Sequence, residues 1–481
     1  MAEDKEKKAL ETSVLGQNSS EPSIHDGAIS YDEAEREMHE VFKKTESGVD
    51  FRTVTWQRAT LIFLKIQIST GILGIPGALY SLGAVGGGLS IIGWQILNTW
   101  TAILLAEFRN RHPECHNPNI SSIALVDMCG KMWGPIGKEF VGVMFIIAYV
   151  FCTGSGILGT SIAFNALSEH GACSVVFSFV STVMVIMVSS VRTWGKMTWP
   201  LTAGFVSVMA GVLTVTIGVT LRDRPAAAPQ TGDFELGWYA IAYPTFAAGM
   251  TATATIFISS AGGPGYLPVI AEMKKPKDYK KAIILVSFIV AAVYLSVAEV
   301  IYRWCGVWVA SPSLGSAGPL LKKVAFGLAL PSLIISAALF NHTGAKYVFV
   351  RILRDSPHLQ INSFVHWGTW LGVNIFLGVL AWVLAEAIPI FNYLIALAGA
   401  ICFAPMSLIF PACLWMFDFG HYSTGKPGQI AFFYLHILIA LVGALLLIGG
   451  TYGTALSIKE AYATGTIGGA FSCADNSGTV A

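Results

Sequence analysis

Long apolar runs separated by short polar segments dominate the chain from about residue 59 onward. A transmembrane helix needs about 20 mostly apolar residues to cross about 30 Å of hydrocarbon, and the runs reach this length. They lack the ten-residue alternation of outer-membrane strands. A glycine cluster that begins at Gly83 predicts a turn inside the first run. The pattern therefore predicts an all-α polytopic membrane protein with eleven spans, near residues 59–80, 86–108, 140–163, 173–191, 197–221, 238–273, 282–303, 324–345, 366–385, 388–415 and 430–452.

Composition and charge support this class and orient the chain. The protein is 54% hydrophobic and only 12% charged, about half the charged content of a soluble domain. Its 30 basic and 29 acidic residues leave no basic excess for nucleic acid. Most of the Lys and Arg residues fall on the side of the N-terminus, which places that side in the cytosol. We expect a partly disordered cytosolic tail at 1–58, a membrane domain at 59–452 and an extracellular or lumenal tail at 453–481.

Glycine and proline interrupt the first and the sixth span at corresponding positions. The first reads Lys65-Ile-Gln-Ile-Ser-Thr-Gly-Ile-Leu-Gly-Ile-Pro76 and the sixth reads Phe257-Ile-Ser-Ser-Ala-Gly-Gly-Pro-Gly-Tyr-Leu-Pro268. One break alone would also fit close helix packing. Two breaks five spans apart fit an inverted repeat of spans 1–5 and 6–10, with span 11 appended. Broken helices in such repeats are typical of the binding site of a secondary transporter.

Three sequence motifs resemble one family. Gly71-Ile-Leu-Gly-Ile-Pro76 is similar to the first-span motif of the amino acid/auxin permease family, and Pro268-Val-Ile-Ala-Glu-Met-Lys-Lys-Pro276 is similar to its sixth-span ending. Ala385-Glu-Ala-Ile-Pro-Ile-Phe391 resembles its tenth span. The likeness covers about residues 50–452 and is nearest to fungal neutral amino acid permeases of the methyltryptophan-resistance type. It implies a LeuT-type fold of five plus five helices and secondary transport of amino acids, usually driven by a cation gradient.

The resemblance also implies a substrate site at the two breaks. Backbone amides would bind the substrate carboxylate, and backbone carbonyls or hydroxyls would bind its ammonium. Phe257 would cover the pocket or, equally, pack as an ordinary aromatic residue. No acidic residue lies near either break, which favours neutral substrates. The predicted substrate-binding residues are Thr70, Gly71, Ile72, Leu73, Gly74, Tyr149, Phe257, Ser259, Ser260, Ala261 and Gly262.

Lys65 is the main candidate for a coupling residue. A lysine inside a span is costly, and its ammonium would replace a sodium ion or exchange a proton. The alternative is that its long side chain reaches the inner surface. Ser336, Asn341 and His342 of span 8 would form the other wall of this site. Histidine suits a proton relay, although a hydrogen-bonded histidine in helix packing is the favoured interpretation of His342. Glu272 would act as an inner gate or form a structural ion pair.

These predictions describe a proton symporter that imports neutral amino acids by alternating access, most simply at the plasma membrane. Sodium coupling, a vacuolar location and a transporter-like nutrient receptor are the alternatives. The nucleotide-binding and hydrolase motifs of pumps and intramembrane enzymes are missing, so we expect no catalytic residues, metal or cofactor beyond the ion gradient. Cys173 and Cys305 fall at predicted outer span ends, where a disulfide between them could form.

Overall fold

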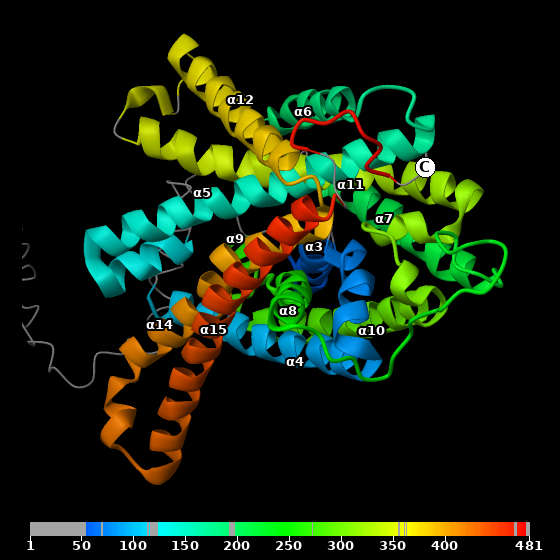
Figure 1. Cartoon of the computed structure of the whole chain (residues 1–481). Coiled ribbons are helices and arrows are strands. Elements are labelled where there is room, and N and C mark those ends of the chain that lie inside the picture. The colour runs from blue at the N-terminus through cyan, green and yellow to red at the C-terminus, as the bar shows by residue number, and fades with distance from the viewer. Residues whose placement is uncertain are drawn as a thin grey trace, which may run out of the picture.

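The computed structural model describes residues 54–68, 71–112, 115, 124–191, 198–271, 273–354, 356–359, 361, 363–465 and 469–477. These residues are almost entirely helical (Figure 1). Eight helical segments among them are long and apolar enough to cross a membrane, and α6 is a shorter apolar helix. The α-helices are α3 (Trp56–Gln67), α4 (Ile75–Arg111), α5 (Ala124–Ser168), α6 (Ser174–Ser189), α7 (Thr198–Thr220), α8 (Phe246–Ser260), α9 (Gly263–Ala271), α10 (Tyr279–Cys305), α11 (Pro319–Leu353), α12 (Phe364–Ala387), α13 (Phe391–Ala398), α14 (Phe410–Asp418) and α15 (Pro427–Ala463).

Short helical turns connect several of these elements. The 3₁₀ turns are η1 (Gly71–Leu73), η4 (Pro276–Asp278), η5 (Gly306–Trp308), η6 (Ser313–Ala317), η7 (Pro357–Leu359) and η10 (Gly420–Thr424). Two π-helical turns, η8 (Gly399–Phe403) and η9 (Pro405–Ile409), join α13 to α14 within one continuous stretch. Single π turns inside helices often mark functional sites, because they displace side chains from the regular helical faces.

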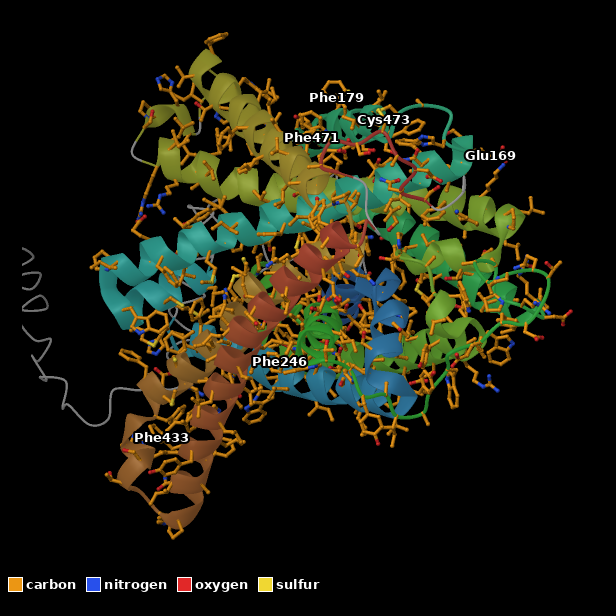
Figure 2. The ribbon with its side chains drawn as sticks, in the orientation of Figure 1. Glu169, Phe179, Phe246, Phe433, Phe471 and Cys473 are labelled. Carbon is orange, nitrogen blue, oxygen red and sulfur yellow. A yellow bond between two sulfur atoms is a disulfide. The ribbon has the colours of Figure 1, made fainter. Side chains whose placement is uncertain are left out.

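The outer surface of the helices is apolar. Phe179 is 55% exposed and Phe246 is 59% exposed, and Phe179 lies at the outer edge of the molecule in Figure 2. A water-facing surface would not present large apolar side chains along so many helices. The surface is suited to lipid, which agrees with the membrane class predicted from the composition.

The break predicted in the first span is present. Helix α3 ends at Gln67, one 3₁₀ turn follows, and α4 begins at Ile75. The predicted turn at Gly83 is also present, as a kink with φ of 76° inside α4. A Cβ there would lie 2.7 Å from the backbone nitrogen of Ala242, so both the left-handed backbone and the close approach require glycine.

The sixth predicted span is shorter than expected. Residues 238–245 are not helical, and α8 begins at Phe246 after the capping residue Thr245, whose hydroxyl accepts a hydrogen bond from the backbone of Ala248. The carbonyls of Tyr239 and Ala240 instead accept hydrogen bonds from the amides that follow the Gly83 kink. This segment therefore caps the second part of α4. The break itself lies where it was predicted, at Ala261 and Gly262 between α8 and α9.

The helices pack in two groups. In the first group α4 packs against α8, α9 and α10, and α3 packs against α10. In the second group α11 packs against α5, α6 and α7, and α12 packs against α5. Figure 1 shows the second group in its upper part and α4, α8 and α10 in its lower part. Helix α15 packs along α8 on the outside.

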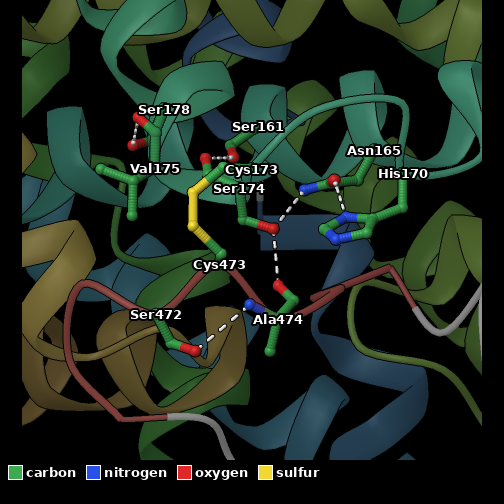
Figure 3. The surroundings of a disulfide bond; sticks show 10 residues. All are labelled: Ser161, Asn165, His170, Cys173, Ser174, Val175, Ser178, Ser472, Cys473 and Ala474. Carbon is green, nitrogen blue, oxygen red and sulfur yellow. Dashed lines mark hydrogen bonds between the residues drawn. A yellow bond between two sulfur atoms is a disulfide. The ribbon is translucent and has the colours of Figure 1, made fainter.

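The C-terminal tail corrects the predicted cysteine pairing. Cys173 is bonded to Cys473 (Figure 3), whereas Cys305 is a buried thiol at the end of α10. Helix α15 continues to Ala463, beyond the predicted end of the last span, and the tail then returns past the beginning of α6. There Ser174 Oγ donates to the carbonyl of Ala474 over 2.6 Å. The tail therefore brings a cysteine to Cys173 that the reasoning from span ends did not consider.

Candidate functional site

The two breaks lie against each other in the interior. A Cβ on Gly71 would lie 2.7 Å from Ser259 Oγ and 3.0 Å from Ser259 Cα. Only glycine allows this approach of the η1 backbone to α8. A Cβ on Gly74 would lie 3.1 Å from the Thr255 side chain, so the same contact continues along α8. The predicted meeting of the first and sixth spans is therefore present, although Thr70 lies outside the described residues.

A cavity opens where the breaks meet the other helix group. Its lining includes five of the predicted substrate-binding residues: Gly71, Tyr149, Ser259, Ala261 and Gly262. The other lining residues, which sequence reasoning did not assign to the substrate site, are Ile66, Gln67, Phe145, Cys152, Ser155, Ile258, Pro264, Gly265, Phe340, Ile395, Ala398, Phe403 and Met406. None of the described lining residues carries a charged side chain.

Regular helical spacing could have predicted some of the lining residues that sequence reasoning did not assign to the site. Phe145, Cys152 and Ser155 lie on the same face of α5 as Tyr149, at intervals of three or four residues. The prediction of Tyr149 as a site residue therefore implied that these three residues also face the site. Phe403 and Met406 lie on the π-helical turns between α13 and α14. Regular helix spacing does not predict which side chains a π turn directs inward.

Five predicted residues at the breaks do not line the cavity: Ile72, Leu73, Gly74, Phe257 and Ser260. Ile72 and Leu73 are buried in the core, and Gly74 lies beside Asn392 and Thr255. Phe257 is fully buried, with its ring edge-on to Trp94 at 5.1 Å between centroids, while its neighbour Ile258 faces the cavity.

Ser260, the last residue of α8, binds neighbouring helices through its carbonyl and its hydroxyl. The carbonyl of Ser260 accepts a hydrogen bond from Gln67 Nε2 over 2.9 Å, and its hydroxyl donates to the carbonyl of Phe257. Asn98 Nδ2 donates to the same hydroxyl over 2.8 Å. Ser260 therefore ties α8 to α3 and α4 behind the cavity.

Lys65 lies in the interior between the two helix groups. Its Nζ donates to Ser332 Oγ at 3.0 Å and to Ser336 Oγ at 3.1 Å, both on α11, and the side chain is only 3% exposed. The ammonium therefore does not reach the surface. Both described partners are neutral hydroxyls, so the donor of each hydrogen bond is charged and the acceptor is not.

Asn341 and His342 form a separate cluster from Lys65. Asn341 Nδ2 donates to Ser189 Oγ over 2.9 Å, and His342 Nδ1 lies 3.0 Å from the carbonyl of Ser189. The His342 ring is edge-on to Trp370 at 5.2 Å. This cluster joins α11 to α6 and α12, so Ser336 is the one of these three predicted residues that binds Lys65. The predicted gate Glu272 lies outside the described residues.

Two broken helices that meet at a buried cavity are an arrangement typical of transporter folds. Residues 52–456 match the model of the family described as transmembrane amino acid transporter protein. The chain belongs to this family, as the motifs of the first, sixth and tenth spans predicted.

Similarities to known proteins support this family assignment and the fold. A protein of Gibberella moniliformis named transmembrane transporter is 52% identical over 457 residues, which cover 95% of each chain. The N amino acid transport system protein of Neurospora crassa is 29% identical and covers 89% of this chain and 90% of its own. A solved structure of a Na⁺-coupled sialic acid symporter, in a substrate-bound outward-open state, has a TM-score of 0.51 at 14% identity, covering 89% of this chain and 96% of that one. That likeness establishes the fold alone, and it agrees with the predicted LeuT type.

Proposed function

We propose that this protein is a secondary active transporter that imports neutral amino acids by proton symport with alternating access. The observation that carries this proposal is the cavity at the two breaks, because it combines the ends of broken helices at one side with an apolar wall at the other. The name of the Neurospora crassa relative supports amino acids as the substrate class. Import across the plasma membrane is the simplest role, with the vacuolar membrane as the alternative.

The helix ends around the cavity suit the charged groups of an amino acid. Helix α8 ends at Ser260, so its carbonyls present partial negative charge to an ammonium group. Helix α9 begins at Gly263, between the lining residues Gly262 and Pro264, so its first free amides present partial positive charge to a carboxylate. A zwitterion placed between these ends would have both charges matched by backbone groups.

The opposite wall of the cavity suits an uncharged side chain. Tyr149, Phe340 and Phe403 supply aromatic surface from α5, α11 and η8, and Met406 and Ile395 supply aliphatic surface. A cationic or anionic substrate side chain would lose its hydration without gaining an opposite charge from the described lining. This supports aliphatic and aromatic amino acids as the preferred substrates.

Lys65 is the proposed coupling residue. Its ammonium lies between the helix groups and is held by two hydroxyls on α11. Loss of a proton would remove the charge and weaken this link between α3 and α11, and regaining it would restore the link. A protonation cycle at this position would therefore couple a proton gradient to movement of the broken helices.

The test is uptake of labelled neutral amino acids into proteoliposomes that contain the purified full-length protein. An inward proton gradient and an inward sodium gradient are imposed separately. We expect accumulation above the external concentration with the proton gradient alone. Accumulation only with sodium would overturn proton symport, and saturable binding without accumulation under either gradient would favour the receptor alternative.

A further inference from the structure

One tyrosine joins the ends of both broken helices. Tyr294 lies on α10, and its side chain is 2% exposed. Its hydroxyl is 2.7 Å from the carbonyl oxygen of Gln67 and 3.1 Å from that of Ser259. Helix α3 ends at Gln67 and α8 ends at Ser260, so both carbonyls belong to last turns that no further helical turn can satisfy.

The partners of Gln67 reinforce the same junction. Its Nε2 donates to the carbonyl of Ser260 and to Gln95 Oε1, and its Oε1 accepts from the hydroxyl of Tyr266 over 2.7 Å. The amide is thereby fixed in one orientation. Gln67 and Ser259 both line the cavity, so any shift of these two carbonyls changes the substrate site itself.

The Tyr294 hydroxyl lies where two backbone carbonyls could otherwise bind a cation. Carbonyls at the unwound ends of broken helices are the groups with which transporters of this kind hold an alkali cation. Here two such carbonyls, one from each broken helix, converge on a protein hydroxyl. A phenol has a single proton, so at any moment it donates fully to one carbonyl and leaves the other available to a second donor.

We propose that Tyr294 is a positioning residue whose hydroxyl takes the place of an alkali cation between the two broken helices. It holds the carbonyls of Gln67 and Ser259 at the substrate cavity without a bound ion. Because the proton prefers the nearer carbonyl of Gln67, the Ser259 carbonyl accepts the substrate ammonium when the cavity is filled. The proposal deepens the proposed function and rests on the cavity being the amino acid site.

The role of Tyr294 is separable from that of Lys65. The Lys65 ammonium reaches across to Ser332 and Ser336 on α11 and so links the two helix groups. Tyr294 acts within one group, between α3, α8 and α10. A change at Tyr294 is therefore expected to alter substrate affinity, whereas a change at Lys65 alters the response to the proton gradient.

The experiment measures the equilibrium dissociation constant of a labelled neutral amino acid on purified full-length protein. Wild type and Tyr294→Phe are titrated in NaCl, KCl or LiCl and in N-methylglucamine chloride at equal ionic strength. We expect no cation dependence in the wild type. In the variant without alkali cations we expect affinity to fall about five- to fiftyfold, because the carbonyls of Gln67 and Ser259 lose the single hydroxyl donor that they share. We expect one of the small cations to occupy the vacated position and restore most of that loss.

Tyr302→Phe is the matched control, because Tyr302 is a fully buried tyrosine on the same helix whose hydroxyl contacts the backbone of Tyr239 outside the breaks. It should leave affinity and cation response unchanged. Unchanged affinity in Tyr294→Phe, or a loss that no alkali cation reverses, would overturn the proposal. If Tyr294→Phe cannot be purified in a folded form, a saturable rise of wild-type affinity with sodium would overturn it instead, and no rise would support it. Failure of proton coupling in the liposome assay would not alter these binding ratios, so the two proposals fail separately.

Discussion

Lys65 on α3 and Ser336 on α11 are joined by a hydrogen bond of 3.1 Å, although 271 residues separate them in the chain. Ser332, one turn earlier on α11, binds the same ammonium at 3.0 Å. These bonds join the group of helices that contains both breaks to the group that forms the opposite wall of the cavity. Movement of one group against the other must stretch or break them, so the charge of Lys65 affects which arrangement is favoured.

Lys65→Met is expected to abolish proton-driven accumulation while leaving substrate exchange across the membrane. Methionine is unbranched and slightly shorter than lysine, and it has neither a charge nor an ionisable proton. We expect accumulation under a proton gradient to fall about tenfold or more, because the charged hydrogen bonds to α11 are lost. Counterflow of labelled substrate in preloaded liposomes measures exchange without a gradient.

Lys65→Arg separates a proton carrier from a permanent charge. Arginine stays protonated in proteins, so it should fail to drive accumulation even though it restores the charge. If the arginine variant accumulates substrate as the wild type does, Lys65 has a purely electrostatic role and the coupling proposal is wrong.

Gly71→Ala is expected to weaken substrate binding without unfolding the protein. The new methyl group would lie 2.7 Å from Ser259 Oγ, so η1 and α8 must separate at the cavity. We expect substrate affinity to fall about tenfold or more, since overpacking at a tight site costs about 1–3 kcal/mol. Gly93→Ala is the control, because a Cβ there meets nothing within 4 Å. Alanine at an exposed helical position should be neutral or stabilise by about 0.5–1 kcal/mol. Equal affinity in the two variants would contradict the close contact of the breaks.

The sequence was sufficient to predict the class, the breaks and five of the eighteen residues that line the cavity. The length of the apolar runs identified the membrane helices, and Gly71 and Gly262 marked the positions where helices end. Residues 238–245 are as apolar as a span, yet their carbonyls cap the kinked α4, a tertiary contact that hydropathy cannot reveal. The count of eleven spans stays a prediction, because α3, α6, α8 and α9 are each too short to be identified as spans by length alone.

The parts that were not predicted depend on contacts between distant segments. Asn341 and His342 follow Ser336 on α11 by five and six residues, but the helix turns them toward α6 and α12. The sequence around Tyr294 and Gln95 did not indicate a role at the site. Their role follows from their hydrogen bonds to Gln67, which lies far away in the chain. Pairing of Cys173 with Cys473 likewise required the return path of the C-terminal tail.

Ala398→Leu is expected to shift substrate preference toward smaller amino acids. Ala398 is buried at the end of α13 and lines the cavity. Leucine would fill part of the space that the apolar wall leaves for a substrate side chain. We expect the ratio of KM for a large aromatic substrate to KM for alanine to rise about tenfold, the usual scale for a few methylene groups in a tight pocket. A uniform loss for all substrates would indicate a folding defect, and an unchanged ratio would place the substrate side chain elsewhere.

The disulfide between Cys173 and Cys473 provides a test of both the cross-link and the orientation of the chain. The protein has eight cysteines, so alkylation after denaturation should modify six without reductant and eight after reduction. Cys473→Ser should give seven in both cases. Cys305→Ser, the matched control, should give five before reduction and seven after, because it leaves the bond intact.

The same bond should lie on the non-cytosolic side, where disulfides persist. In intact cells that carry the protein at the plasma membrane, an impermeant maleimide should therefore label Cys473 only after treatment with an impermeant reductant. Cys173→Ser removes the partner and should allow labelling of Cys473 without reductant. Labelling that requires permeabilised cells would place the C-terminal tail in the cytosol and would contradict the orientation inferred from the distribution of lysine and arginine.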